Sequence, residues 1–293
     1  MSSQTLSRRR EAITGVLFLL PVLVIFVAFK FVPILGAAGM SFTRYRLNGD
    51  VTFIGGDNYT RLLADANFWH SVGVTFLYVV LFVPATIVVS LGGAMLLNAV
   101  AGSATGIFRA LLFIPYLSSF VLAGIIWSWI FRSDGPLNAA LGELGPVHFL
   151  TGNRLLVLAS LAVVSIWKGF GYSMLVFLAG LKAQPAEVYE AALLDGASPR
   201  QIFLRITLPL LKPVFFFVLV METIIGFQVF DTIYVMTGGG PARASFSITY
   251  FLYDAGFKFL DFGYAAAIGV ALFLIVLVLS ILQRRWLEEK ETA

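Results

Sequence analysis

Long apolar runs separated by short polar segments dominate this chain of 293 residues. A helix that crosses the hydrocarbon core of a bilayer needs about 20 mostly apolar residues. Six windows meet this requirement, and each run is continuous, whereas the strands of a transmembrane barrel would alternate. The predicted spans are 13–31, 72–97, 110–131, 155–178, 213–235 and 264–282. The expected fold class is therefore an all-α integral membrane protein with six transmembrane helices in one domain over 1–293.

Composition supports a bilayer as the solvent. Hydrophobic residues make up 59% of the chain and charged residues 12%, and the mean hydropathy is +0.91. The net charge of +4 comes from basic residues beside apolar runs and not from a basic stripe, so nucleic acid is not expected as a partner. Because cysteine is absent and His70 and His148 are isolated, the sequence predicts no disulfide and no metal site.

The positions of Lys and Arg predict the orientation. With the N-terminus in the cytoplasm, the longer outer segments hold seven of the twenty basic residues, and Lys30 and Lys168 lie within spans. The inner segments hold the other eleven: Arg8, Arg9, Arg10, Arg109, Lys182, Arg200, Arg205, Lys212, Arg284, Arg285 and Lys290. Because cytoplasmic loops carry an excess of Lys and Arg, both termini and the loop 182–212 are predicted to be cytoplasmic.

The first half of the loop 182–212 predicts a short helix. Pro185 and Glu187 suit its first turn, because proline needs no donor there and an acid favours the positive helix end. The helix is expected to run to about Leu194. Asp195 and Gly196 then end it, since glycine adopts a left-handed C-cap at the lowest cost.

A second short helix is predicted after this bend. Ser198 suits the N-cap, Pro199 the first position and Gln201 the capping box, and the helix is expected to end before Pro209. Two short helices around a tight bend can insert into a groove of a partner protein. An amphipathic loop can equally lie on lipid headgroups, and the pattern alone leaves both interpretations open.

Seven residues of this loop match a motif at every position: E-A-A, three residues, G, nine residues, I-x-L-P. They are Glu190, Ala191, Ala192, Gly196, Ile206, Leu208 and Pro209. The chain thereby resembles the membrane-spanning permease subunits of binding-protein-dependent ABC importers, which carry this EAA loop. The segment from Phe230 to Pro241 is similar to the fifth-span exit of carbohydrate permeases of the MalF-like type, and the resemblance covers nearly the whole chain.

The resemblance implies the fold of an ABC type I importer permease, in the cytoplasmic (inner) membrane of a bacterium or archaeon. The implied cargo is a sugar, either an oligosaccharide or a related solute such as glycerol phosphate. The implied partners are a second, non-identical permease, two ATPase subunits, a solute-binding protein outside the membrane, and lipid. ATP and Mg²⁺ would bind the ATPase, and this chain would bind no cofactor. The implied ATPase-coupling residues are Glu190, Ala191, Ala192, Asp195, Gly196, Ala197, Ile206, Leu208 and Pro209.

The sequence independently indicates that any ATPase is a separate protein. A phosphate-binding P-loop needs the pattern G-x-x-x-x-G-K-[ST], and none of the lysines in this chain follows a glycine. The chain is therefore predicted not to be an enzyme and to have no catalytic residue.

Ionisable residues inside predicted spans are costly and mark functional candidates. At a rise of 1.5 Å per residue, Lys168 and Glu222 lie roughly 15 Å and 13 Å from the cytoplasmic helix ends, so they could meet. One hypothesis is that Lys168 and Glu222 pair with each other, or with a neighbouring subunit, and so fix helix packing. The other is a substrate path. The candidates for that path are Trp167, Lys168, Tyr172, Glu222, Phe227, Gln228 and Asp231.

Two other classes of protein compete with an ABC permease. In an ion-coupled secondary transporter, Glu222 and Asp231 would be proton or cation sites. The second class, an intramembrane hydrolase, is not expected, because the sequence has no G-x-S-x-G or H-E-x-x-H pattern. Pro84 and Pro115 are expected to kink the second and third spans.

Overall fold

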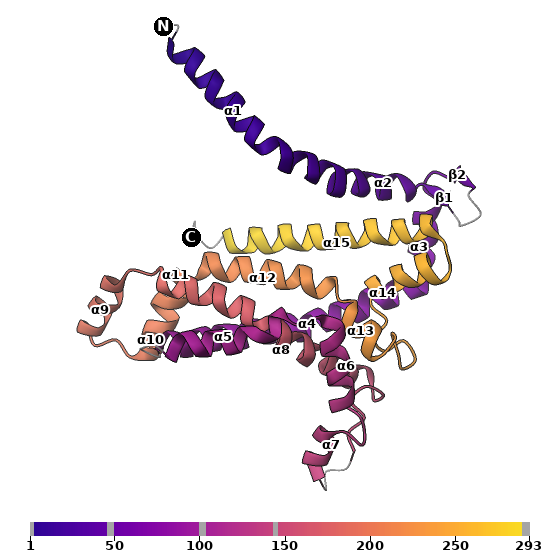
Figure 1. Cartoon of the computed structure of the whole chain (residues 1–293). Helices are drawn as coiled ribbons and strands as arrows, with labels where there is room; N and C mark the ends of the chain where they lie inside the picture. Colours follow the sequence, from indigo (N-terminus) through magenta and orange to yellow (C-terminus); the bar gives the residue numbers. More distant parts are fainter. Residues whose placement is uncertain (1–2, 46–49, 100–103, 143–145, 289–293) are drawn as a thin grey trace. The chain divides into compact units, whose positions relative to one another are not determined.

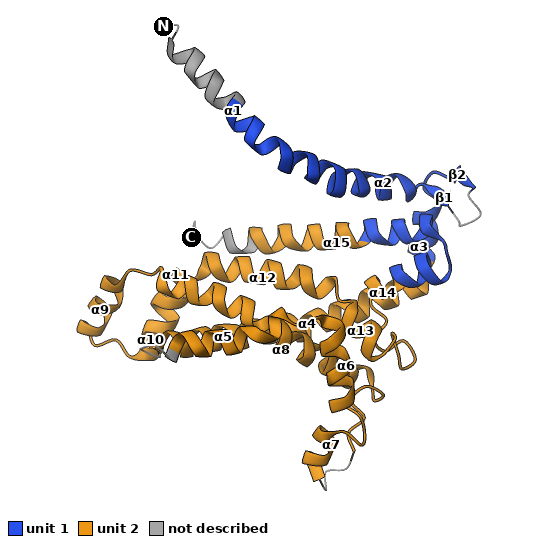
Figure 2. Cartoon of the chain, in the orientation of Figure 1, with its two compact units in different colours: residues 1–64, 252–271 blue, residues 65–251, 272–293 orange. Residues whose placement is uncertain are grey.

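The computed structural model describes the backbone of residues 3–45, 50–99, 104–142 and 146–288. This described chain is mostly helical and divides into two compact units, 1–64 with 252–271 and 65–251 with 272–293 (Figure 2). The single transmembrane domain expected over 1–293 stays a prediction.

Five helices among the described residues are long and apolar enough to cross a membrane. They are Thr14–Met40, Ala66–Ala99, Arg154–Lys182, Lys212–Met236 and Phe262–Arg285. Each matches one predicted span and extends beyond it at one or both ends. A bent pair of helices, Thr105–Leu117 and Phe120–Ile130, makes a sixth crossing if it is counted as one span. The all-α membrane fold is therefore confirmed.

The third predicted span, 110–131, is broken and not continuous. Helices α5 (Ala104–Leu117) and α6 (Phe120–Ile130) meet at an angle of 94°. Pro115 lies inside α5, but the break comes a few residues later, where Ser119 has an extended backbone (φ −71°, ψ 141°). The Ser119 hydroxyl caps α6 by accepting from a backbone N–H, so a new helix starts here in a new direction.

The first unit contains a small hairpin that the all-α prediction missed. Strands β1 (Thr43–Tyr45) and β2 (Val51–Phe53) pair antiparallel. Asn58 donates to the carbonyls of Ser41 and Thr43 at 2.8 and 2.9 Å, and Arg61 pairs with Asp261 at 2.7 Å. The other elements with residues here are α1 (Ser3–Phe26), η1 (Val27–Phe31), α2 (Val32–Met40), α3 (Asp57–Ala64), α14 (Ile248–Tyr253), η4 (Asp254–Lys258) and α15 (Phe262–Glu288).

In the second unit, α4 (Ala66–Ala99) packs along α8 (Arg154–Lys182). The Ser90 hydroxyl of α4 donates to the Phe170 carbonyl of α8 at 3.1 Å. A Cβ on Gly171 would lie 2.6 Å from the Leu112 carbonyl oxygen, so glycine allows α5 to approach α8 closely. The remaining elements are α7 (Pro136–Leu141), α9 (Ala186–Leu194), α10 (Pro199–Ile202), η3 (Phe203–Thr207), α11 (Leu208–Leu210), α12 (Lys212–Phe227) and α13 (Asp231–Met236). Within this unit, α9 and α10 lie at one end, and α7 and α13 lie at the other (Figure 1).

Candidate functional site

A cavity of about 370 Å³ lies inside the second unit, between side chains of α4, α5, α6, α8, α12 and α13. We refer to it as the Lys168 cavity. Five of the seven residues predicted for a substrate path line it: Lys168, Tyr172, Glu222, Gln228 and Asp231. Residues that are far apart in sequence therefore line one cavity.

Trp167 and Phe227 do not line this cavity, and their place on a substrate path stays a prediction. Trp167 makes an edge-to-face contact with Trp127 at 5.6 Å between ring centroids. Phe227 is 2% exposed and packs edge-on against Phe76 at 5.0 Å. Trp167 precedes Lys168 on α8, and a one-residue step turns a side chain about 100° around the helix axis. Phe227 is the last residue of α12 and precedes Gln228, which is no longer helical.

Lys168 braces the bend between α5 and α6. Its ammonium donates to the backbone carbonyl of Tyr116 at 3.1 Å and lies 4.1 Å from the ring centroid of Phe120. Tyr116 belongs to the last turn of α5, where carbonyls lack helical partners and a cation is favourable, and Phe120 is the first residue of α6. One side chain thus contacts both arms of the broken span.

Glu222 is 3% exposed and accepts a hydrogen bond from the Ser173 hydroxyl at 2.5 Å. The bond joins α12 to α8. Lys168 and Glu222 both belong to the described chain, and no ion pair connects them. The hypothesis of a Lys168–Glu222 packing pair is therefore wrong, because each group is held by its own partner.

The fifth predicted span is interrupted where it meets the cavity. Helix α12 ends at Phe227, α13 begins at Asp231, and Gln228 to Phe230 are not helical. The freed carbonyls of Phe227 and Val229 accept hydroxyl groups of Thr249 and Ser247 at 3.2 and 3.1 Å. Non-helical backbone at membrane depth is tolerated where protein buries it or where it lines a cavity.

Aromatic rings form much of the cavity wall. Tyr116 and Tyr172 stack at 5.4 Å with an interplanar angle of 19°, and Tyr78 and Phe82 stack at 5.6 Å with an angle of 11°. Thr232, which is 1% exposed, also lines the cavity, and its hydroxyl has no hydrogen-bond partner in the structure. Tyr78 and Thr232 were not predicted as site residues, although each is a polar group within a predicted apolar span.

The bend of the loop 182–212 has the geometry that its sequence predicts. Helix α9 ends at Leu194, and Gly196 has φ of +75°. The Gly196 N–H donates to the Leu193 carbonyl at 3.1 Å, and the Ala197 N–H donates to the Ala192 carbonyl at 3.0 Å. These two bonds form a Schellman C-cap, in which glycine supplies the left-handed residue.

The second helix of the loop starts as predicted but does not end as predicted. Ser198 and Gln201 form a capping box, with Pro199 at the first helical position. The helical path continues past Pro209 to Leu210 through the π-helical segment η3. Proline removes one backbone donor, and the wider π-turn just before it lets the chain continue without a regular α-helical bond there.

The exposed surface of the bend differs in part from expectation. Ala192 is 8% exposed, so its small size serves packing within the loop. Leu194 is 90% exposed and Leu193 is 63% exposed, and neither is among the predicted coupling residues. Of the other predicted coupling residues, Ala197, Ile206 and Leu208 are half-buried, whereas Glu190, Ala191, Asp195, Gly196 and Pro209 are exposed.

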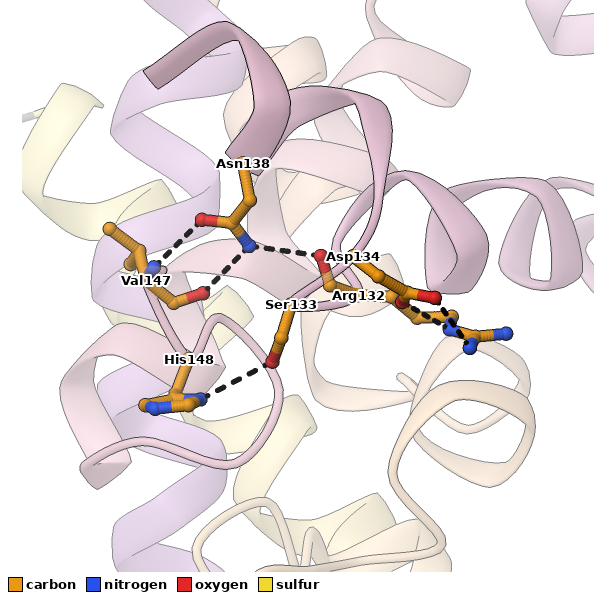
Figure 3. A network of polar contacts seen from close by, with 6 residues as sticks. All are labelled: Arg132, Ser133, Asp134, Asn138, Val147 and His148. Carbon is orange, nitrogen blue, oxygen red and sulfur yellow. Dashed lines mark hydrogen bonds and ion pairs between the residues drawn. The ribbon is translucent and has the colours of Figure 1, made fainter. Parts of the chain in front are cut away.

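A wider hollow of about 810 Å³ lies at the α7 and α13 end of the same unit. Asn138 fixes the loop beside it by donating to the carbonyls of Arg132 and Val147 at 2.9 and 3.1 Å and accepting from the Val147 N–H at 2.7 Å (Figure 3). Arg132 and Asp134 form a two-point ion pair, with both contacts at 2.9 Å. Asn138 thus joins the described residues Arg132 and Val147 on the two sides of this loop.

Residues 98–288 match the family model described as "Binding-protein-dependent transport system inner membrane component". The trehalose/maltose transport system permease protein MalF of Thermococcus litoralis is 36% identical, over 93% of this chain and 92% of the relative. The arabinooligosaccharides transport system permease protein AraP of Bacillus subtilis is 36% identical, over 91% and 86%. The sn-glycerol-3-phosphate transport system permease protein UgpA of Brucella abortus is 36% identical, over 93% and 94%.

A solved structure has a similar fold over the whole chain. It belongs to a bacterial ABC transporter involved in the import of the acidic polysaccharide alginate, with a TM-score of 0.81 and 22% identity, covering 98% of this chain and 99% of that one. The family membership sets aside the ion-coupled secondary transporter and supports a transport role over an enzymatic one. The family implies an ATPase and a solute-binding protein as partners. The chain is a multi-pass permease subunit of the binding-protein-dependent ABC importer family.

Proposed function

We propose that this permease imports a carbohydrate, an oligosaccharide or a related solute such as glycerol phosphate, through the Lys168 cavity. The stacked ring pairs in the cavity wall offer flat apolar faces, and Gln228, Asp231 and Thr232 offer polar groups beside them. Apolar walls with a few polar groups are typical of small-molecule sites. The named cargoes of the relatives, trehalose/maltose, arabinooligosaccharides and sn-glycerol-3-phosphate, belong to the same chemical range.

In this proposal both chain termini and the loop 182–212 are cytoplasmic, in the inner membrane of a bacterium or archaeon. The exposed bend at Leu194 to Gly196 inserts into a groove of the ATPase, which binds ATP and Mg²⁺, while this chain binds no cofactor. A second, non-identical permease completes the pathway, and two ATPase subunits drive it. The single supporting observation is the rigid, capped bend that presents Leu193 and Leu194 outward.

The 810 Å³ hollow is the proposed contact surface for the solute-binding protein. It lies at the opposite end of the second unit from the loop 182–212, and its loop is fixed by Asn138. A surface fixed before binding loses less conformational freedom when a partner docks.

Reconstitution tests the cargo and the energy source together. Proteoliposomes would contain this chain, its partner permease, the ATPase and the binding protein, and would be offered labelled maltose, arabino-oligosaccharides and sn-glycerol 3-phosphate. Uptake of one of these that requires ATP and survives an uncoupler supports the proposal. Uptake by this chain alone, driven by an ion gradient, would overturn it.

Two variants connect the cargo to the cavity. Tyr172→Ala and Gln228→Ala are expected to change the preference among these solutes, because both residues line the cavity. Trp167→Ala is the matched control, since Trp167 neighbours a cavity residue but does not line the space. An equal change in the control would contradict the assignment.

A further inference from the structure

Three side chains join the two arms of the loop 182–212 at its base. The Tyr189 hydroxyl donates to the side-chain carbonyl of Gln184 and lies 3.2 Å from the Thr207 hydroxyl. The Gln184 amide donates to the Thr207 backbone carbonyl at 3.4 Å. We call these three residues the Tyr189 clamp. Gln184 and Tyr189 belong to the arm before the bend, and Thr207 belongs to the arm after it.

The contacts of the clamp depend on one another. A phenol carries one proton, so when Tyr189 donates to Gln184, the Thr207 hydroxyl supplies the proton of the third contact. Thr207 is 6% exposed and ends the π-helical segment, which places its carbonyl within reach of Gln184. Removing the Tyr189 hydroxyl therefore removes two contacts of the cluster, and removing the Thr207 hydroxyl removes one.

The clamp lies next to the helices that form the cavity. Helix α8 ends at Lys182, shortly before Gln184, and α12 begins at Lys212, shortly after Thr207. The Ser173–Glu222 bond joins the same two helices deeper in the unit. A hollow of about 400 Å³ beside the clamp is also lined by Met95, Asn98 and Ala99, at the end of α4. The base of the loop thus continues directly into α8 and α12 and lies beside the end of α4.

We propose that the Tyr189 clamp closes the loop 182–212 into one rigid body, so that a displacement of the bend at Gly196 moves α8 and α12 together. Its members are positioning residues for energy coupling, and the inference rests on the proposed contact of the loop with an ATPase. Without the clamp, the two arms would move apart under load, and ATP hydrolysis would proceed without displacement of the cavity helices. Coupling requires two conformations of the permease whose balance both the ATPase and the cavity can shift. A loop that deforms transmits less of that shift between them.

The test uses the complete transporter in proteoliposomes, with binding protein and cargo. Tyr189→Phe and Thr207→Val remove one hydroxyl each and keep the side-chain shape. Each variant is expected to retain the ATPase on purification and to hydrolyse ATP, but uptake per ATP should fall about fivefold or more, the lower end of typical coupling between sites. The double variant should be no worse than either single one. Wild-type uptake per ATP in both single variants would overturn the proposal.

A cysteine pair separates positioning from folding. The chain has no cysteine, so Gln184→Cys with Thr207→Cys creates a unique pair. We expect low uptake per ATP before treatment and recovery to near the wild-type ratio after a short bifunctional thiol reagent links the two arms. Uptake that stays low, or falls further, after linkage would overturn the proposal. Tyr253→Phe in α14 is the control for loss of a tyrosine hydroxyl elsewhere. If the wild-type chain itself never retains an ATPase, the proposed function fails and not the clamp.

Discussion

The ammonium group of Lys168 in α8 donates to the backbone carbonyl of Tyr116 in α5 at 3.1 Å. The same group lies over the ring of Phe120 in α6, so it spans the 94° bend between the two helices. Lys168 also lines the cavity that we propose as the solute path. The side chain that supports the bend therefore also lines the cavity.

Exchange of the two buried charges tests this arrangement. If Lys168 and Glu222 formed an ion pair, Lys168→Glu combined with Glu222→Lys would restore a function that each single change abolishes. Because each group has a different partner, we expect no restoration of uptake in the double variant. Restored uptake in proteoliposomes would contradict the structure.

Loss of the Lys168 contacts alone should destabilise the bend. Lys168→Met keeps the length of the side chain but removes the hydrogen bond and the cation–π contact, with an expected cost of about 1–3 kcal/mol. Thermal unfolding of the purified chain in detergent measures this loss. Lys168→Arg, which keeps the charge and donors, should lose less, and an equal loss in both variants would argue against the role of these contacts.

The Ser173–Glu222 bond predicts an asymmetry between two variants. Ser173→Ala removes the donor from a carboxylate that is 3% exposed, and a buried group left unsatisfied costs about 1–3 kcal/mol. Glu222→Gln keeps an acceptor for Ser173 and should cost less. Thermal unfolding of both variants measures the two losses of stability. If Ser173→Ala were more stable than Glu222→Gln, the prediction would be wrong.

A side chain at position 196 should strain the backbone without a steric clash. A Cβ at this position would meet no atom within 4 Å, but φ of +75° is unfavourable for an L-residue by roughly 1–2 kcal/mol. Gly196→Ala is therefore expected to weaken the C-cap of α9 and to lower the amount of ATPase that co-purifies. Gly196→Asn is the informative control, since asparagine tolerates the left-handed region better and should retain more ATPase.

Leu194 should matter for the ATPase contact and not for the stability of this chain. It is 90% exposed beside the bend, so Leu194→Asp breaks no internal packing. We expect this variant to unfold at the wild-type temperature but to lose most of the co-purified ATPase. Phe53→Asp is the matched control, because Phe53 is 79% exposed in β2, on the predicted outer side. If Leu194→Asp retained the ATPase, the bend would not be the contact.

The sequence by itself determined the features that depend on local chemistry. Apolar length located the five long helices, because a bilayer requires about 20 apolar residues per crossing whatever the tertiary arrangement, but it did not predict the break in the third span. Asp195-Gly196 and Ser198-Pro199 predicted the end of α9 and the start of α10, since caps are formed by neighbours in sequence. The EAA spacing indicated the family for the same reason: the motif lies within one continuous loop.

Only the tertiary structure decided what depends on the direction of a side chain and on partners far away in sequence. Their depths along two helices allowed Lys168 and Glu222 to meet. The direction of each side chain around its helix instead places Lys168 at the Tyr116 carbonyl and Glu222 at the Ser173 hydroxyl. Side-chain direction also decides that Tyr78 and Thr232 line the cavity and that Trp167 and Phe227 do not. The contact between Tyr189 and Thr207 and the support of the bend by Lys168 likewise arise where separate segments pack together, which apolar periodicity does not encode.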